Sequence, residues 1–216
     1  MTQTRIKFCG MARAEDVRLA VELGVDYIGL VFAPRRPRHV PLDRARTLRE
    51  LVPAEVAVVA LVMDSPAADI DAVIENVRPD LLQFHGAEDD AFCASFGLPF
   101  FKSVAMGGEA ADPRQAASRY PSSYGLVLDG HAPGEAGGSG QRFDWTRSPR
   151  ELGKPFLLAG GLSADNVGLA IRTARPWGVD VSSGIERAPG VKQGEHMRFF
   201  VEESRRADSS RDHGQD

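Results

Sequence analysis

Short apolar runs alternate with longer amphipathic stretches along the whole chain. Most of the short runs are continuously apolar, which is typical of strands buried on both faces of a parallel sheet. The pattern predicts eight strands: Arg5–Cys9, Tyr27–Phe32, Val56–Met63, Leu81–Phe84, Phe100–Val104, Gly125–Asp129, Phe156–Ala159 and Val179–Ser182.

Helical patterns occupy the intervals between these runs. A clear start is Ser65-Pro66, because proline is well tolerated in a first helical turn, and an apolar stripe follows it. The pattern over Thr146–Leu152 is weak. The predicted helices are Ala14–Leu23, Leu42–Leu51, one starting at Ser65-Pro66 with its stripe at Ile70, Val73, Ile74 and Val77, Glu88–Phe96, Pro113–Arg119, Thr146–Leu152, Ser163–Arg175 and Lys192–Arg206.

Eight strand–helix units in a chain of this length predict an α/β protein with a single (β/α)₈ TIM barrel over residues 1–206. The polar tail 207–216 has no hydrophobic period and is expected to be disordered. The alternative is an open, doubly wound sheet. It would need eight strands in one sheet, and Cys9-Gly10-Met11-Ala12-Arg13 is not a glycine-rich dinucleotide loop.

Composition narrows the function. The 216 residues carry 26 basic and 30 acidic side chains, a net charge of −4, which disfavours nucleic acid as the main partner. The longest apolar run, Val56–Met63, is far shorter than the roughly 20 residues that span a bilayer. Two cysteines and no secretory signal pattern favour a cytoplasmic protein with no membrane partner.

In a barrel of this kind the active site lies at the carboxyl ends of the strands. Glycines follow the last two predicted strands, at Gly160-Gly161 and at Ser183-Gly184. Glycine lets backbone N–H groups approach an anion closely, and loops after strands 7 and 8 commonly bind phosphate in this fold. The alternative is a pair of ordinary turns. The pattern favours a phosphorylated small-molecule substrate.

Two further side chains end predicted strands. Cys9 ends the first strand with Lys7 on the same strand face, so it is a candidate base or nucleophile, although a cysteine there is more often a packing residue. Asp129 ends the sixth strand and is a candidate general acid or base, or a structural hydrogen-bond acceptor. A barrel would place the two across its mouth from each other.

The remaining candidates lie in loops. Arg35, Arg36 and Arg38 form a cationic segment that is either solvated or binds a substrate carboxylate. The glycine-rich stretch 134–141 is either a slack loop or a mobile lid. His85 is expected to line the mouth without a catalytic role. Cys93 is expected to pack inside a helix. No spacing along the sequence indicates a metal site, so none is predicted.

Taken together, the motifs resemble phosphoribosylanthranilate isomerase of tryptophan biosynthesis, in order and at the spacing of that family, from about Arg5 to Phe200. The motifs that carry the resemblance are Lys7-Phe8-Cys9-Gly10-Met11, Gly29-Leu30-Val31-Phe32-Ala33-Pro34 with Arg38, Gln83-Phe84-His85-Gly86, Leu128-Asp129, Gly137-Gly138-Ser139-Gly140 with Phe143-Asp144-Trp145, Ala159-Gly160-Gly161-Leu162 with Asn166-Val167, and Asp180-Val181-Ser182-Ser183-Gly184-Ile185-Glu186. Met11-Ala12-Arg13 departs from the family's pattern after Gly10.

The resemblance implies an Amadori rearrangement without a cofactor, from N-(5-phosphoribosyl)anthranilate to 1-(2-carboxyphenylamino)-1-deoxyribulose 5-phosphate. It implies that Asp129 is the general acid, Cys9 the general base and Arg38 the partner of the anthranilate carboxylate. It further implies phosphate binding near Gly160, Gly161, Ser183 and Gly184. The family includes monomers and homodimers.

Three alternatives remain open from the sequence. A Schiff-base lyase on the same barrel would use Lys102 or Lys7 as its amine. A non-catalytic phosphosugar-binding barrel would show no turnover. The related ribotide isomerisation of histidine biosynthesis is disfavoured, because the isomerases of that class carry aspartate where this chain has Cys9.

Overall fold

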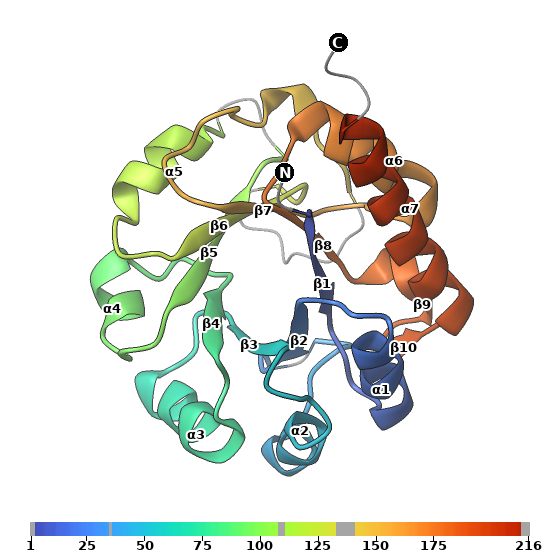
Figure 1. Cartoon of the computed structure of the whole chain (residues 1–216). Helices are drawn as coiled ribbons and strands as arrows, with labels where there is room; N and C mark the ends of the chain where they lie inside the picture. The colour runs from blue at the N-terminus through green and yellow to red at the C-terminus, as the bar shows by residue number, and fades with distance from the viewer. Residues whose placement is uncertain (1–2, 35, 108–110, 133–140, 213–216) are drawn as a thin grey trace.

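The structure is a computed structural model, which describes residues 3–34, 36–107, 111–132 and 141–212. Eight parallel strands form a closed barrel in sequence order, and β8 pairs with β1 to close it. Figure 1 shows the strands at the centre and the helices outside them. The predicted barrel is therefore confirmed. The strands are β1 (Arg5–Cys9), β2 (Tyr27–Val31), β3 (Ala57–Val62), β4 (Leu81–Phe84), β5 (Phe100–Ala105), β6 (Gly125–Asp129), β7 (Phe156–Leu158) and β8 (Gly178–Val181).

The helices follow the predicted order with one exception. The helices are α1 (Ala14–Glu22), α2 (Leu42–Arg49), α3 (Ala67–Val77), α4 (Asp90–Ala94), α5 (Pro113–Arg119), α6 (Ala164–Ala174) and α7 (Gly194–Asp212). The predicted helix over Thr146–Leu152 is wrong, because the segment holds only the single 3₁₀ turn η1 (Trp145–Arg147). Pro149 explains this, since the residue before a proline avoids helical geometry and Ser148 is extended.

A small hairpin between β8 and α7 is not predicted by the sequence pattern. After the 3₁₀ turn η2 (Ser183–Ile185), strand β9 (Glu186–Ala188) pairs antiparallel with β10 (Val191–Lys192). The turn between them contains Gly190, whose φ of +77° suits glycine. The hairpin takes Lys192 out of the predicted helix Lys192–Arg206, so α7 begins at Gly194.

The predicted disorder of the tail is wrong for residues 207–212. Helix α7 continues to Asp212, and residues 213–216 lie outside the described part of the chain. Asp208 accepts hydrogen bonds from the backbone N–H (2.9 Å) and hydroxyl (2.5 Å) of Thr4, and Arg205 donates to the Thr4 carbonyl at 2.6 Å. The polar residues of this last part of α7 thus connect the two ends of the barrel chain, which a search for hydrophobic period does not detect.

The pleat of the strands decides which side chains enter the barrel. Alternate residues face the interior, where Val59, Leu81, Phe101, Val127, Leu157 and Ala159 pack together as one cluster. Two residues beyond Val127, Asp129 faces the same way at the carboxyl end of β6. In β1, Lys7 and Cys9 share this inward face, with Cys9 nearer the carboxyl end. The outer faces of the strands pack against the helices in the larger core cluster.

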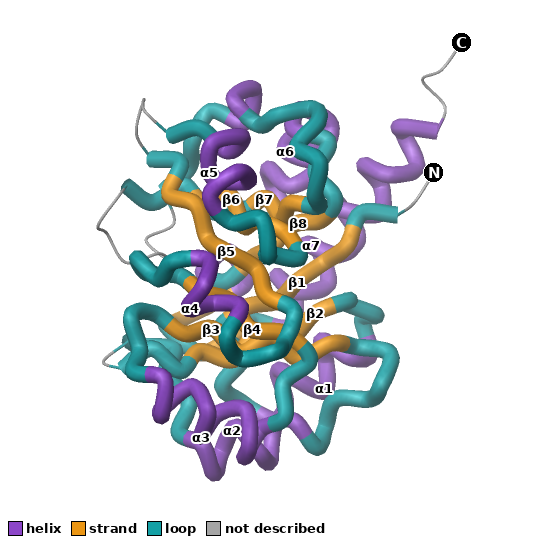
Figure 2. Tube along the Cα trace, turned by 90° about the vertical axis from the view of Figure 1, so that its left-hand side faces the viewer, coloured by secondary structure: helices purple, strands orange, loops and turns teal. Residues whose placement is uncertain are grey.

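No helix among the described residues is long and apolar enough to cross a membrane. The tube in Figure 2 shows that the strands run obliquely through the interior and that loops gather at both rims of the barrel.

Replacement of Asp208 by alanine tests the role of the last part of α7. Because Asp208→Ala leaves two buried polar groups of Thr4 without their acceptor, we expect the free energy of unfolding to fall by about 1–3 kcal/mol. Glu202→Ala, at an exposed position of the same helix, should stay within about 0.5 kcal/mol of the parent. Urea titration followed by circular dichroism measures both, and equal stabilities of the two variants would contradict the assignment.

Candidate active site

A cavity of about 300 Å³ opens at the carboxyl ends of the strands. Of the seven site residues predicted from the sequence, six border it, and only Gly184 does not. The lining residues are Cys9, Val31, Ala33, Arg36, Pro37, Arg38, Leu61, Met63, Gln83, His85, Asp129, Ala159, Gly160, Gly161, Leu162, Asp180, Val181, Ser182 and Ser183.

Cys9 lies at the end of β1 and is 7 % exposed. Below it in the barrel, Lys7 is fully buried and its ammonium contacts the Asp180 carboxylate at 2.9 Å. Burial raises the pKa of the Cys9 thiol, and the charges of Lys7 and Lys192 oppose that shift only in part. Cys9 is therefore mainly a thiol at neutral pH, with a protonated lysine next to it.

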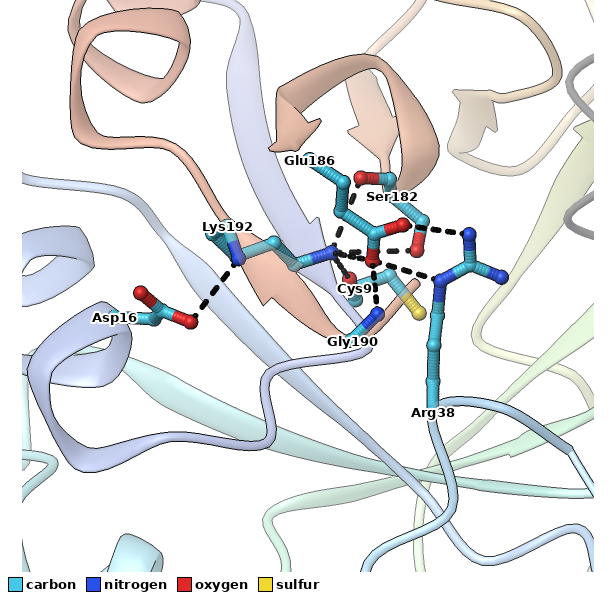
Figure 3. Close-up of polar contacts among 7 residues, drawn as sticks. All are labelled: Cys9, Asp16, Arg38, Ser182, Glu186, Gly190 and Lys192. Carbon is cyan, nitrogen blue, oxygen red and sulfur yellow. Dashed lines mark hydrogen bonds and ion pairs between the residues drawn. The ribbon is translucent and has the colours of Figure 1, made fainter. Parts of the chain in front are cut away.

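Lys192 joins the ends of β1 and β8 (Figure 3). Its buried ammonium donates to the Cys9 carbonyl at 2.6 Å, to the Ser182 carbonyl at 3.0 Å and to Glu186 at 2.9 Å. Its backbone N–H donates to Asp16 at 3.2 Å, which also fixes the hairpin on α1. These bonds hold the backbone of Cys9 in place, so the position of the sulfur depends on a residue 183 positions along the chain.

Arg38 meets Glu186 through two parallel hydrogen bonds of 2.8 Å, from Nε and from Nη2. Burial alone would raise the pKa of Glu186. The hydrogen bonds from Arg38 and Lys192 outweigh this effect and hold that pKa below its ordinary value. The Glu186 pair occupies one edge of the guanidinium, and Figure 3 shows the other terminal nitrogen directed away from Glu186. A second carboxylate can bind at that free edge. Arg36 also borders the cavity, whereas Arg35 lies outside the described residues.

Asp129 lies between two histidines at the other side of the mouth. Its carboxylate oxygens are 3.4 Å from His131 Nδ1 and 4.0 Å from His85 Nε2. Burial lowers the pKa of His85 to about 4, so this ring is neutral at pH 7. Burial alone would raise the pKa of Asp129, but His131 beside it keeps that pKa below its ordinary value. Without substrate, Asp129 is therefore a carboxylate.

The same three side chains are the group among the described residues whose ligand atoms lie close enough together to hold a metal ion. One ligand atom from each of His85, Asp129 and His131 lies within 4.8 Å of the others. The sequence shows no spacing typical of a metal site, because His85 follows β4. Asp129, by contrast, ends β6, and His131 stands two residues after it.

The two glycine turns form one continuous surface beside Asp129. Gly160 and Gly161 have φ angles of +87° and +61°, and a Cβ on Gly160 would lie 2.3 Å from the backbone nitrogen of Gly130. A Cβ on Gly184 would lie 1.8 Å from the Leu162 carbonyl, so the turn after β8 packs directly on the turn after β7. Within the described residues, the backbone N–H groups of Gly161, Ser183 and Gly184 donate no hydrogen bond and remain available to an anion.

Neither lysine considered for a Schiff base borders the cavity. Lys7 is paired with Asp180, and Lys102 donates to Glu88 at 3.1 Å and to the Phe84 carbonyl at 3.4 Å. The described lining of the cavity contains no lysine, which argues against the lyase alternative. Cys93 is fully buried in α4 and lies outside the cavity, as predicted for a packing residue.

Sequence reasoning misses the residues that surround the candidates. It assigns Lys192 to a helix, gives Glu186 no role within its motif, and does not single out His131. His131 could have been predicted as a site residue, because it stands two residues after Asp129, a carboxylate that ends a buried strand. Lys192 has none, since only the folded hairpin brings it to Cys9.

Comparison with known proteins gives a consistent result. The family model for N-(5′-phosphoribosyl)anthranilate isomerase matches residues 6–203. A protein of that name from Xanthomonas campestris is 56 % identical over 211 residues, which cover 95 % of each chain, and one from Stenotrophomonas maltophilia is 54 % identical over 207 residues, with the same coverage. The crystal structure of phosphoribosyl anthranilate isomerase from Thermotoga maritima superposes with a TM-score of 0.85 at 32 % identity and covers 94 % of this chain and 98 % of its own. The chain belongs to the N-(5′-phosphoribosyl)anthranilate isomerase family.

Proposed function

We propose that this chain catalyses the Amadori rearrangement of N-(5′-phosphoribosyl)anthranilate to 1-(2-carboxyphenylamino)-1-deoxyribulose 5-phosphate in tryptophan biosynthesis. Asp129 acts as general acid and Cys9 as general base. The observation that supports this most directly is that both side chains border one cavity from opposite sides of the barrel mouth. A relative in the same family has been crystallised with the reduced product; it is 29 % identical, with a TM-score of 0.82.

The two anionic ends of the substrate have separate binding sites. The phosphate binds the glycine turns after β7 and β8, where the N–H groups of Gly161, Ser183 and Gly184 donate no hydrogen bond to another described residue. The anthranilate carboxylate binds the edge of Arg38 that Glu186 leaves open. The sugar then spans the cavity between Cys9 and Asp129.

The first proton transfer opens the ribose ring. Asp129 gives a proton to the ring oxygen, the C1–O bond breaks, and the anilino nitrogen supplies the electron pair of the resulting iminium. For this step Asp129 must be protonated, although His131 favours the carboxylate in the free enzyme. Bound phosphate and carboxylate disfavour a third negative charge nearby, so substrate binding raises the pKa of Asp129 towards the acid form.

The second transfer removes the proton from C2. The electron pair of the C2–H bond neutralises the iminium and forms an enamine, which tautomerises to the ketone, so no atoms or electrons are gained. Cys9 accepts this proton as a thiolate. Lys7 and Lys192 stabilise that thiolate, and the iminium adds a further positive charge at the moment when the base is needed.

The pH dependence follows from the two shifted groups. Turnover needs Asp129 protonated and Cys9 ionised, whereas the free enzyme mainly holds this proton on Cys9. At any pH between the pKa of Asp129 and the pKa of Cys9, the two groups together hold one proton. The fraction of enzyme with that proton on Asp129 is then constant, so kcat/KM should be flat at neutral pH. It should decline only below the ordinary aspartate value of about 3.9 and above the ordinary cysteine value of about 8.5.

Steady-state assays between about pH 5 and pH 10 cover the flat region and the alkaline decline of this profile. Cys93→Ala leaves Cys9 as the only cysteine of the chain, so iodoacetamide labelling of that variant reports the pKa of Cys9 directly. The labelling rate should rise with the same pKa as the alkaline decline of kcat/KM. A decline centred near pH 7 would contradict the assignment.

Substitution of the two transferring groups should reduce the rate without loss of binding. Asp129→Asn and Cys9→Ala each remove one proton transfer, and we expect kcat to fall by about 10²–10⁴-fold. Cys93→Ala is the matched control, because Cys93 is buried outside the cavity, and its kcat should equal that of the parent. Near-parental kcat in Asp129→Asn would remove the role assigned to Asp129.

Arg38 and Arg36 are distinguished by substrate affinity. Arg38→Lys loses the fork geometry towards both Glu186 and the substrate, so KM should rise by about 10–100-fold, which corresponds to the usual value of a charged hydrogen bond. Arg36→Lys retains a charge at an exposed position and should change KM by less than about threefold. The reverse order of effects would assign the substrate carboxylate to Arg36.

A further inference from the structure

Two histidine rings lie against Asp129, and their buried nitrogens are poorly satisfied: His131 Nδ1 has only a long contact of 3.4 Å with Asp129, and His85 makes no hydrogen bond among the described residues. His85 comes from the end of β4 and His131 from the segment after β6, and the rings stack with centroids 4.9 Å apart. Both ring nitrogens of His85, and Nδ1 of His131, are buried and have no hydrogen-bond partner among the described residues. Buried polar atoms are nearly always satisfied, so such a group of three nitrogens indicates a ligand.

The three side chains bring one ligand atom each within 4.8 Å of the others, close enough for small side-chain movements to join them on one metal ion. His131 Nδ1 lies 3.4 Å from one carboxylate oxygen of Asp129, and His85 Nε2 lies 4.0 Å from the other. Two ligands of a tetrahedral zinc ion, each bound at about 2.0–2.1 Å, are about 3.4 Å apart. The His131 pair already has this separation. The His85 distance is to the other carboxylate oxygen and is about half an ångström longer, and the ligand atoms as a set lie within 4.8 Å of one another, so the side chains must turn inward to meet on one ion.

We propose that His85, Asp129 and His131 form a binding site for Zn²⁺ or a similar borderline divalent ion, and that occupation of this site inhibits the enzyme. Two imidazole nitrogens and one carboxylate oxygen supply three positions, and His85 and Asp129 border the cavity, from which water supplies a fourth. This donor set favours zinc, cobalt or nickel over magnesium, which prefers an all-oxygen shell.

We expect inhibition because the metal would bind the carboxylate of Asp129, the proposed general acid. A metal bound to the Asp129 carboxylate occupies the oxygen that would carry the proton for ring opening, and its positive charge further lowers the pKa of that group. The inhibitory half of the inference rests on the proposed function of Asp129, whereas the binding half does not. Binding and turnover are therefore measured separately.

The binding experiment titrates the metal-free, full-length chain with Co²⁺ and follows its visible absorption, with equilibrium dialysis of Zn²⁺ as the second measure. Wild type should bind one ion with nitrogen ligation in addition to any surface sites. His131→Asn and His85→Gln should each weaken this binding by at least tenfold. His196→Asn, which removes an exposed histidine of α7, is the matched control and should bind as the parent does.

Cys9 is the competing ligand in the cavity, and Co²⁺ distinguishes it, because a cobalt–thiolate bond gives an intense charge-transfer band in the near ultraviolet. Such a band, lost in Cys9→Ser while both histidine variants bind normally, would overturn the site. Equal affinity in the parent and both histidine variants would also overturn it.

The activity experiment adds Zn²⁺ to the enzyme during turnover of phosphoribosylanthranilate. Zn²⁺ should inhibit the parent and His196→Asn at the concentration that fills the dialysis site, and a chelator should restore the rate. Unchanged or increased turnover at full occupancy would overturn the inhibitory half. Absence of turnover in metal-free enzyme would instead refute the proposed function and leave the binding result standing.

Discussion

Closure of β8 on β1 is the constraint on which the whole site depends. At this seam Lys7 and Asp180 are register neighbours, and their side chains form an ion pair at 2.9 Å inside the barrel. One layer higher, Lys192 binds the carbonyls of Cys9 and Ser182 across the same seam. A shift of one strand along the other would break these contacts and leave a buried charge without a partner, which is costly. The two lysines therefore fix the relative height of β1 and β8 as well as their pairing. Cys9 and the phosphate turn thus keep one geometry.

The pleat extends this constraint around the barrel. Because alternate side chains of every strand face inward, the last inward position of each strand faces the mouth, whatever residue occupies it. Cys9 and Asp129 hold that position in β1 and β6. A register slip of one residue would turn either group onto the helical layer. The strand pleat does not determine the direction of residues beyond the last inward position, such as Arg38 and His131. Their contacts depend on the conformation of the loops.

This difference explains how far the sequence can be read. The strands, the barrel and the inward direction of Cys9 and Asp129 follow from continuous apolar runs and from the position of each polar residue at a strand end. The hairpin of Glu186 and Lys192 does not follow, since its strands are three and two residues long and its partners lie on β1, α1 and the loop after β2. The continuation of α7 to Asp212 escapes prediction for a related reason, because its stabilising contacts are polar and reach residues of the N-terminal segment.

The charges of the site are arranged for a substrate that brings two negative groups. In the free protein each proton-transferring group holds the protonation state opposite to the one that its step requires, because burial keeps Cys9 a thiol and His131 keeps Asp129 a carboxylate. An anionic substrate reverses the balance at Asp129, and its iminium intermediate reverses the balance at Cys9. The dry environment that contributes to these shifts also leaves both ring nitrogens of His85 without a hydrogen-bond partner among the described residues, next to a carboxylate. A site that sets the protonation of an acid by desolvation and neighbouring imidazoles therefore also brings together the kinds of donor atom that a borderline divalent metal ion prefers.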